Sequence, residues 1–273
     1  MIFFPNCKIN LGLHITRKRP DGFHDLQTLF YPLPITDALE IITNLKGEKE
    51  VALTLSGTSI DASSDNICVR AYQLLKKDFT QLPPVTMHLH KTIPVGAGLG
   101  GGSADGAFTL LLLNKKYNLG LTQQQLLQYA LQLGSDCPFF IINKPCLGSG
   151  RGEDLAEVDI HLSNYKVVVV NPGIHINTGW AFSQLQPKEP ELPLADIIKK
   201  DVSEWKHFMV NDFEAPIFSH HPQVKEIKDE LYRTGAVYAS MSGSGSTVFG
   251  LFEKPAPTSY AFPATYYVKE CYL

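Results

Sequence analysis

The N-terminal stretch alternates apolar and polar side chains with a period of two. Between residues 8 and 15, apolar side chains occupy every second position, with polar side chains or glycine between them. Such alternation is typical of a strand with one buried face, so we predict a half-buried strand whose polar face carries Lys8 and Asn10. A Pro-Asp-Gly turn at residues 20–22 leads into a second run at residues 23–30. Together the two runs predict a broad hairpin.

The remainder of the first half combines short alternating runs with helical patterns. The alternating runs predict strands at residues 38–42, 51–55 and 85–89. Apolar side chains at helical spacing predict a helix over residues 69–79, with Asp65 as its N-cap. A second helix is predicted over residues 123–133, between Thr122 as its cap and Gly134 as its terminator.

The second half restarts the pattern after a loose glycine cluster. Strands are predicted at residues 166–170, 236–240, 246–252 and 266–271, and helices from Thr178 and from Pro222. Alternating strands and helices of this kind predict an open-faced α+β sandwich. The chain has 273 residues, enough for two compact domains. We place the boundary near residue 155, which gives domains 1–154 and 155–273.

The stretch from Pro94 to Gly106 is dominated by glycine. Five of its first nine residues have no side chain: Gly96, Gly98, Gly100, Gly101 and Gly102. Glycine permits positive φ and close approach of a ligand, and the N-terminus of a helix attracts anions. A flexible linker would not be flanked by a strand pattern and by the apolar helix pattern of residues 108–113. We therefore predict a phosphate-binding loop that opens a helix.

The known kinds of phosphate loop fit this stretch poorly. Gly96, Gly98 and Gly101 satisfy GxGxxG, but a dinucleotide site needs a buried strand before the loop and an acid about 20 residues beyond it. Here the preceding strand alternates, and the first acid after Asp105 is Asp136. A Walker loop needs a lysine after its last glycine, and none is present. Neither His-Arg-Asp nor Asp-Phe-Gly of the protein kinases occurs. Cations from outside the loop, such as Mg²⁺, must therefore replace the missing lysine.

Composition limits the binding partners and the cellular location that we expect for this protein. The formal net charge of −3 gives no general attraction to nucleic acid or to an anionic membrane. The five cysteines are an odd number without a CxxC pair, which favours reduced thiols in a cytoplasm. No basic leader with an apolar core is visible, and no run reaches the roughly 18 apolar residues of a membrane span. We expect a cytoplasmic protein that binds neither nucleic acid nor membrane.

Several motifs together carry a family resemblance. Residues 94–104, 5–11 and 242–247 resemble the three motifs of the GHMP kinases, small-molecule kinases named for galactose, homoserine, mevalonate and phosphomevalonate. The stretches Asp21-Gly22-Phe23-His24 and Gly134-Ser135-Asp136-Cys137-Pro138 also match, and the resemblance covers nearly the whole chain. It implies an N-terminal domain like domain 2 of ribosomal protein S5, a C-terminal ferredoxin-like α+β sandwich, and an active site in the cleft between them.

The resemblance also implies an activity. The chain would be an ATP-dependent kinase that uses Mg²⁺ and phosphorylates a small molecule carrying cytidine diphosphate, in isoprenoid precursor biosynthesis. The Asp-Gly-Phe-His stretch separates this specificity from homoserine or mevalonate phosphorylation. Those specificities, and a nucleotide-binding protein without catalysis, remain the alternatives. The sequence leaves open whether the chain is a monomer or a weak homodimer.

The same resemblance assigns roles to residues. Asp136 would be the catalytic base, and Lys8 the cation that holds both the aspartate and the incoming phosphate. From the residues alone, the stretch 134–138 is either a rigid loop that holds one carboxylate in place or a solvated turn, and Lys8 is a surface lysine on an edge strand. The implied ATP site comprises Asn66, Lys91, Pro94, Val95, Gly96, Ala97, Gly98, Leu99, Gly100, Gly101, Gly102, Ser103 and Ala104, with the Ser103 hydroxyl able to reach phosphate or Mg²⁺. The implied acceptor site comprises Asn10, Phe23, His24, Thr178 and Phe182.

Two stretches depart from the family pattern. The family more often has tyrosine where Phe23 stands, so a hydroxyl is lost while the stacking face remains. Residues 255–265 contain three prolines where a last helix would be expected. Because proline interrupts helices, we predict that this helix is shortened or lost.

Overall fold

The chain folds into two compact units that interleave along the sequence. The computed structural model describes residues 1–44, 49–58, 65–255 and 260–273. Unit 1 comprises Met1–Cys7, Ile35–Val95 and Gly100–Asn143, and unit 2 comprises Lys8–Pro34, Gly96–Leu99 and Lys144–Leu273. The units therefore divide the chain differently from a single cut near residue 155. The domain limits 1–154 and 155–273 stay a prediction.

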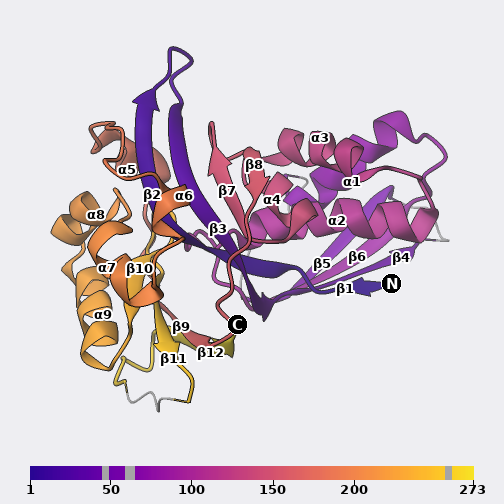
Figure 1. Ribbon diagram of the computed structural model, residues 1–273. Helices are drawn as coiled ribbons and strands as arrows, with labels where there is room; N and C mark the ends of the chain where they lie inside the picture. Colours follow the sequence, from indigo (N-terminus) through magenta and orange to yellow (C-terminus); the bar gives the residue numbers. More distant parts are fainter. Residues whose placement is uncertain (45–48, 59–64, 256–259) are drawn as a thin grey trace. The chain divides into compact units, whose positions relative to one another are not determined.

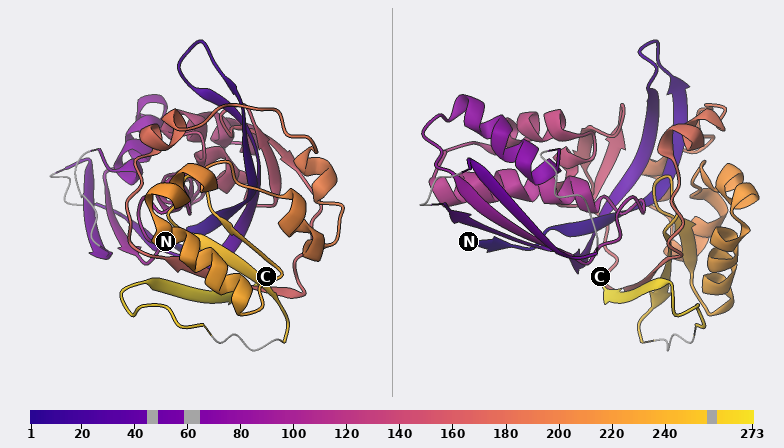
Figure 2. Two further views of the ribbon diagram at one scale, coloured as in Figure 1. Left: turned by 90° about the vertical axis from the view of Figure 1, so that its left-hand side faces the viewer. Right: turned by 180° about the vertical axis from the view of Figure 1, so that it is seen from behind.

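Unit 1 is a sheet with helices packed on it (Figure 1). The strand order is β1 (Ile2–Phe3), β4 (Ala38–Thr43), β6 (Val85–Lys91) and β5 (Val51–Gly57). β5 and β6 are parallel, and the other two pairs are antiparallel. The helices are α1 (Ile67–Asp78), α2 (Gly101–Tyr117), α3 (Gln123–Leu133) and α4 (Cys137–Ile142). The right-hand view of Figure 2 shows α1 and α2 lying over one face of these strands.

The helix starts of unit 1 follow local capping chemistry. Thr122 and Gln125 form a capping box at the start of α3, which confirms the predicted cap. The predicted cap of α1 is wrong by one residue. Asn66 precedes the first helical residue, and its side-chain oxygen accepts from the Cys68 amide at 3.0 Å. Asparagine and aspartate cap equally well, so residue preference could not choose between Asn66 and Asp65.

Unit 2 contains most of one sheet and all of another. The first has the order β2 (Asn6–Lys18), β3 (His24–Thr36), β7 (Cys146–Ser149) and β8 (Asp154–Glu157). The second has the order β10 (Tyr238–Met241), β11 (Val248–Glu253), β9 (Tyr165–Asn171) and β12 (Tyr267–Tyr272). Its helices are α5 (Thr178–Ser183), α6 (Leu194–Ile197), η1 (Val202–Glu204), α7 (Trp205–Phe208), α8 (Glu214–His220) and α9 (Pro222–Arg233). The hairpin and the strands β9 to β12 are confirmed, whereas β7, β8 and the helices α6 to α8 were not predicted.

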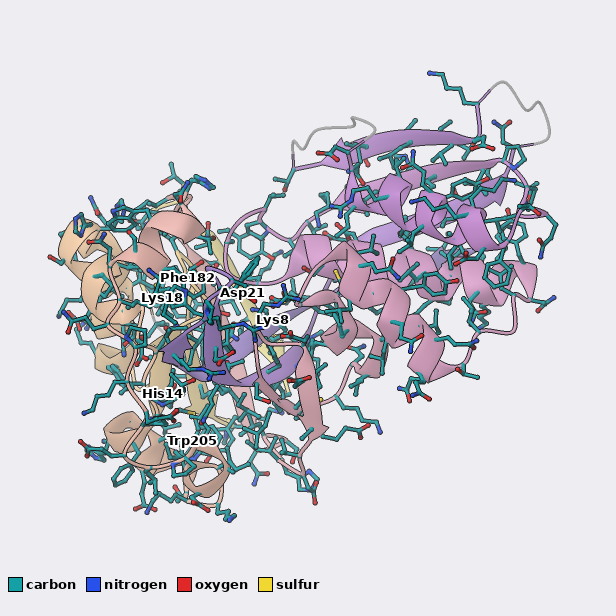
Figure 3. All side chains as sticks on the ribbon, turned by 90° about the horizontal axis from the view of Figure 1, so that it is seen from above. Lys8, His14, Lys18, Asp21, Phe182 and Trp205 are labelled. Carbon is teal, nitrogen blue, oxygen red and sulfur yellow. The ribbon has the colours of Figure 1, made fainter. Side chains whose placement is uncertain are left out.

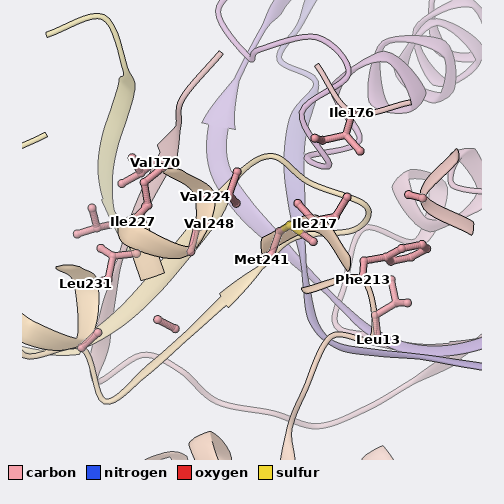
Figure 4. Packing of buried hydrophobic residues seen from close by; sticks show 14 of the residues in the cluster. Leu13, Val170, Ile176, Phe213, Ile217, Val224, Ile227, Leu231, Met241 and Val248 are labelled. Atoms are coloured by element: carbon pink, nitrogen blue, oxygen red, sulfur yellow. The ribbon is translucent and has the colours of Figure 1, made fainter. Parts of the chain in front are cut away.

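The core of unit 2 lies between α9 and the strands (Figure 4). Val224, Ile227 and Leu231 of α9 belong to one buried cluster that also contains Val170 of β9 and Leu13 of β2. These α9 positions are three and four residues apart, so they share one face of the helix. Burying each such side chain stabilises the fold by roughly 1.5–3 kcal/mol.

The prediction that β2 is only half buried is wrong. Residues 6–15 are all buried, including the polar Lys8, Asn10 and His14. These side chains have partners elsewhere in unit 2; for example, His14 Nδ1 lies 3.3 Å from Asp212 Oδ1. Burial of polar groups is tolerated where they are hydrogen-bonded. The alternation therefore predicted an apolar and a polar face correctly, but the polar face is buried rather than exposed to solvent.

The C-terminal region lacks the helix that the family pattern would place there, as far as it is described. Residue 255 and residues 260–265 form no helix, and residues 256–259 of the predicted helix loss lie outside the described residues. Among the described helices, none has the length and apolar character needed to span a bilayer. All five cysteines are described, and no disulfide joins them.

Candidate functional site

The glycine loop has an alternating backbone conformation. Gly96, Gly98 and Gly100 have φ values of 65°, 80° and 69°, and the residues between them do not have positive φ. Where left-handed residues alternate with right-handed helical ones, successive backbone N–H groups turn toward one side and form an anion-binding concavity. Left-handed φ strains other residue types, so this conformation requires the glycines. The glycines at these positions therefore supply the left-handed conformations of the loop, and phosphate binding by this loop stays a prediction.

Gly98 is fixed within unit 2 by Lys8 and Ser242. The Gly98 carbonyl accepts from Lys8 Nζ at 3.1 Å and from Ser242 Oγ at 2.8 Å. A Cβ at Gly98 would lie 2.0 Å from the Ser242 carbonyl oxygen, so no other residue fits there without movement. The Ala97 carbonyl accepts from the Thr247 amide at 3.2 Å. The glycine-rich stretch at residues 242–247 thus supports the loop.

The Lys8 ammonium has a defined position. Lys8 Nζ donates to Asn10 Oδ1 at 2.6 Å, and only 3% of Lys8 is exposed. Asn10 is itself oriented. Its side-chain Nδ2 donates to Thr28 Oγ1 at 2.9 Å, and its backbone N–H donates to Ser242 Oγ at 3.2 Å. Thr28 in turn donates to the Gly12 carbonyl at 2.7 Å. Lys8 and Asn10, predicted from the first motif, therefore lie together beside Gly98.

In unit 1 the loop continues into α2, and Asp136 precedes α4. Gly100 is the N-cap of α2, and Ser103 is its third residue. Asp136 is the N-cap of α4, so the predicted rigid loop is a turn that runs directly into a helix. Burial raises the pKa of the Cys137 thiol to about 12, and the nearby Ser103 side chain opposes this rise. Ser103 therefore lies near Cys137, the residue that follows Asp136.

Lys91 is enclosed by two carboxylates of unit 1. Its Nζ donates to Asp37 Oδ2 and to Asp105 Oδ2, the latter at 2.6 Å, and none of the three side chains is more than 3% exposed. Asp37 also accepts from the amides of Thr92 and Ile93 at 2.6 and 2.9 Å. This triad joins the strand before the glycine loop to the helix after it.

Two groups of the triad, Asp105 and Lys91, have a raised pKa. Burial raises the pKa of Asp105 to about 7 against the opposing effect of Lys91, and the Asp37 carboxylate adds to the rise. Asp105 Oδ1 is buried without a hydrogen-bond partner. Burial lowers the pKa of Lys91, but the two carboxylates outweigh it, and the pKa is raised. Sequence reasoning missed Asp37 and Asp105 because nothing in the spacing connects them to Lys91. ATP contacts by Lys91, and by Asn66 at the start of α1, stay predictions.

The predicted acceptor residues gather in unit 2. The His24 ring stacks on Phe182 with centroids 5.0 Å apart and 19° between the planes. Burial lowers the pKa of His24, and the charge of Lys18 adds to this. Figure 3 shows Lys18 on the hairpin and Phe182 on α5. Thr178 is the first residue of α5, with its hydroxyl 3.4 Å from that of Ser244. The hairpin tip and α5 thus meet through aromatic side chains.

Phe23 has a different neighbour. It is 54% exposed, and the Arg151 guanidinium carbon lies 5.0 Å from its ring centroid. Arg151 belongs to the loose glycine cluster at residues 148–153, to which the sequence assigned no role. The structure therefore pairs His24 with Phe182 and Phe23 with Arg151.

Comparison with known proteins defines the class. A sequence model of the GHMP kinase N-terminal domain matches residues 66–144, and one of the GHMP kinase C-terminal domain matches residues 194–261. The chain belongs to the GHMP kinases, and its two-domain fold is theirs. A mevalonate kinase of Methanococcus jannaschii shares this fold with a TM-score of 0.69 over 94% of this chain and 92% of its own, at 15% identity.

Closer similarity is to one kinase of the family. The chain is 54% identical, over 92% of both proteins, to 4-diphosphocytidyl-2-C-methyl-D-erythritol kinase of Bacteroides fragilis strain YCH46. It is 50% identical to the same kinase of Bacteroides thetaiotaomicron, over 93% of this chain and 92% of that one. The crystal structure of a 4-(cytidine 5'-diphospho)-2C-methyl-D-erythritol kinase matches with a TM-score of 0.77 at 31% identity, over 92% of this chain and 90% of its own. The resemblance inferred from the motifs is confirmed.

Proposed function

We propose that this chain is an ATP-dependent kinase that phosphorylates the 2-hydroxyl of 4-diphosphocytidyl-2-C-methyl-D-erythritol, a step of isoprenoid precursor biosynthesis. The observation that carries this proposal is the 54% identity, over 92% of both chains, to a relative with that printed name. The motif at residues 21–24 supports this acceptor over homoserine or mevalonate. The five cysteines are an odd number without a CxxC pair, which supports a cytoplasmic location.

The glycine loop would hold the ATP phosphates. The left-handed glycines at positions 96, 98 and 100 favour an anion at the loop amides. Among the described residues, no group of three or more His, Cys, Asp and Glu side chains could hold a metal. Mg²⁺ would therefore take most of its ligands from phosphate oxygens and water, with the Ser103 hydroxyl as the protein group in the loop helix. The ion would neutralise phosphate charge during transfer.

Asp136 and Lys8 would act on the reacting groups. Asp136 accepts the proton of the acceptor hydroxyl, whose oxygen bonds to the γ-phosphorus as the bond to ADP breaks. Lys8 supplies positive charge to the transferring phosphate. Its ammonium is already oriented by Asn10 and by the Gly98 carbonyl, so little reorganisation is needed at the moment of transfer.

The acceptor would be recognised by its cytosine. Phe23, His24 and Phe182 offer aromatic faces, and a stacked base contributes about 1–3 kcal/mol by analogy with single-stranded nucleic acid. Thr178 and Asn10 would contact the polyol and phosphate. Since Phe23 has no hydroxyl, its contribution is limited to stacking.

Asp136→Asn tests the chemical roles. Turnover should fall on the order of 10² or more, because a general base is lost, while the ATP dissociation constant measured by calorimetry stays near that of the wild type. Asp159→Asn, at a carboxylate that is 88% exposed, is the matched control and should retain activity. Unchanged turnover of Asp136→Asn would remove this residue from the mechanism.

A further inference from the structure

Arg151 presents its guanidinium to the ring of Phe23. The Arg151 Cζ to ring-centroid distance is 5.0 Å, which lies within the range of a cation–π contact. Arg151 comes from the turn between β7 and β8, and Phe23 from the residue before β3. We propose that Arg151 is a positioning residue of the acceptor site, which holds the Phe23 ring in place as a platform for the cytosine. This role rests on the proposed function.

Contacts within its own turn hold the Arg151 guanidinium in place. The Arg151 amide donates to Glu153 Oε2 at 2.5 Å, and its Nε donates to Glu153 Oε1 at 3.2 Å. The turn is also anchored to β3, because the Gly150 carbonyl accepts from the Leu26 amide at 2.7 Å. One carboxylate thus orients the planar guanidinium, and the backbone fixes where it starts.

Hydrogen bonds fix the backbone of Phe23, whereas its ring is not buried among apolar side chains. Its amide donates to Asp21 Oδ1 at 3.1 Å, and its carbonyl accepts from the Arg19 amide at 2.8 Å. The side chain is nevertheless 54% exposed. A phenylalanine has no hydroxyl to anchor its ring by a hydrogen bond, so contact with the ring face is what remains.

A cation on one ring face suits stacking on the other. The quadrupole of the ring attracts the planar guanidinium, and arginine stacks on aromatic faces more readily than lysine does. Because Phe23 is 54% exposed, our proposal places the base on the ring face opposite Arg151. The contact should therefore increase affinity for the cytosine without touching the hydroxyl that is phosphorylated.

Arg151→Gln tests the role because glutamine keeps part of the stem and removes the cation. Dissociation constants for cytidine, CMP and CDP, measured by calorimetry, should all rise by the same factor of about two to five. The KM for the cytidylylated polyol should rise by the same factor, while kcat and the KM for ATP stay unchanged. Arg151→Lys should recover part of the loss. Lys144→Gln removes an exposed cation from the residues just before β7 and should change none of these values.

A double-mutant cycle separates positioning from direct contact. In a Phe23→Ala background, Arg151→Gln should have no further effect, because the ring on which it acts is gone. A loss for CDP but not for cytidine, or a loss that persists without Phe23, would show a phosphate contact and overturn the positioning role. Wild-type affinity of Arg151→Gln would overturn it too. If the wild type bound no cytidine nucleotide, the proposed acceptor itself would fail, whereas every other outcome bears on Arg151 alone.

Discussion

The triad of Asp37, Lys91 and Asp105 predicts that two similar substitutions have unequal effects. Asp37 accepts from Lys91 Nζ and from two backbone amides, so Asp37→Asn places a buried amide group among donors. Removing one partner of a buried ion pair costs about 3–5 kcal/mol of unfolding free energy. Asp105→Asn keeps an oxygen for Lys91 and places its NH₂ where Oδ1 already lacks a partner. It should cost about 1 kcal/mol or less at pH 7.

The same pair predicts a pH dependence. The pKa of Asp105 is raised to about 7 in the folded protein. Between about pH 4 and pH 7, the folded state therefore holds a proton on Asp105 that the unfolded state has lost. Unfolding free energy from this group therefore rises as the pH falls through that window, by at most about 1.4 kcal/mol per pH unit. Because asparagine does not titrate, the unfolding free energy of the wild type should exceed that of Asp105→Asn by a growing amount as the pH falls.

The assay must report on unit 1. Trp180 and Trp205 both lie in unit 2, so tryptophan fluorescence would follow the wrong part of the chain. Hydrogen exchange of peptides covering β6 and the start of α2, measured by mass spectrometry from pH 5 to pH 8 with correction for intrinsic rates, reports the opening free energy there. Equal losses of opening free energy in Asp37→Asn and Asp105→Asn would refute the reasoning. So would a difference in opening free energy between the wild type and Asp105→Asn that shrinks as the pH falls.

Two further substitutions test the loop and the acceptor site. Gly98→Ala should lower ATP affinity and turnover more than tenfold, because its Cβ would lie 2.0 Å from the Ser242 carbonyl oxygen; Gly120→Ala, at φ 73° with open space around it, is the control that should stay active. Similar ATP affinities of these two variants would remove the close approach as the cause. Phe182→Ala should raise the KM for the cytidylylated polyol about 5- to 150-fold and leave the KM for ATP unchanged, whereas the exposed Phe208→Ala should change neither. Equal changes in both KM values would argue against a stacking role.

Local chemistry explains what the sequence could predict. The hairpin, the loop helix and α9 each have a period or a cap that acts within a few residues. The glycine loop could be interpreted because four other motifs accompany it. Lys8 and Asn10 came from the same short motif, and the structure places them beside Gly98.

What escaped prediction depends on partners far along the chain. The buried polar face of β2 relies on Ser242, which is 232 residues from Asn10. Lys91 finds Asp37 at a separation of 54 residues, and no spacing rule connects these two. The helices α6 and α7 have only four residues each, too few for a helical period to appear. Arg151 was overlooked because its contact is with a ring that was itself assigned only by resemblance.

The most direct test of the central claim is a comparison of kcat/KM for three acceptors with ATP and Mg²⁺. Purified protein would be given 4-diphosphocytidyl-2-C-methyl-D-erythritol, homoserine or mevalonate, with ADP release followed by a coupled assay and the product identified by ³¹P NMR. We expect turnover of the cytidylylated polyol alone, with a new phosphomonoester on its 2-hydroxyl. Turnover of homoserine or mevalonate without turnover of the cytidylylated polyol would contradict the proposed function.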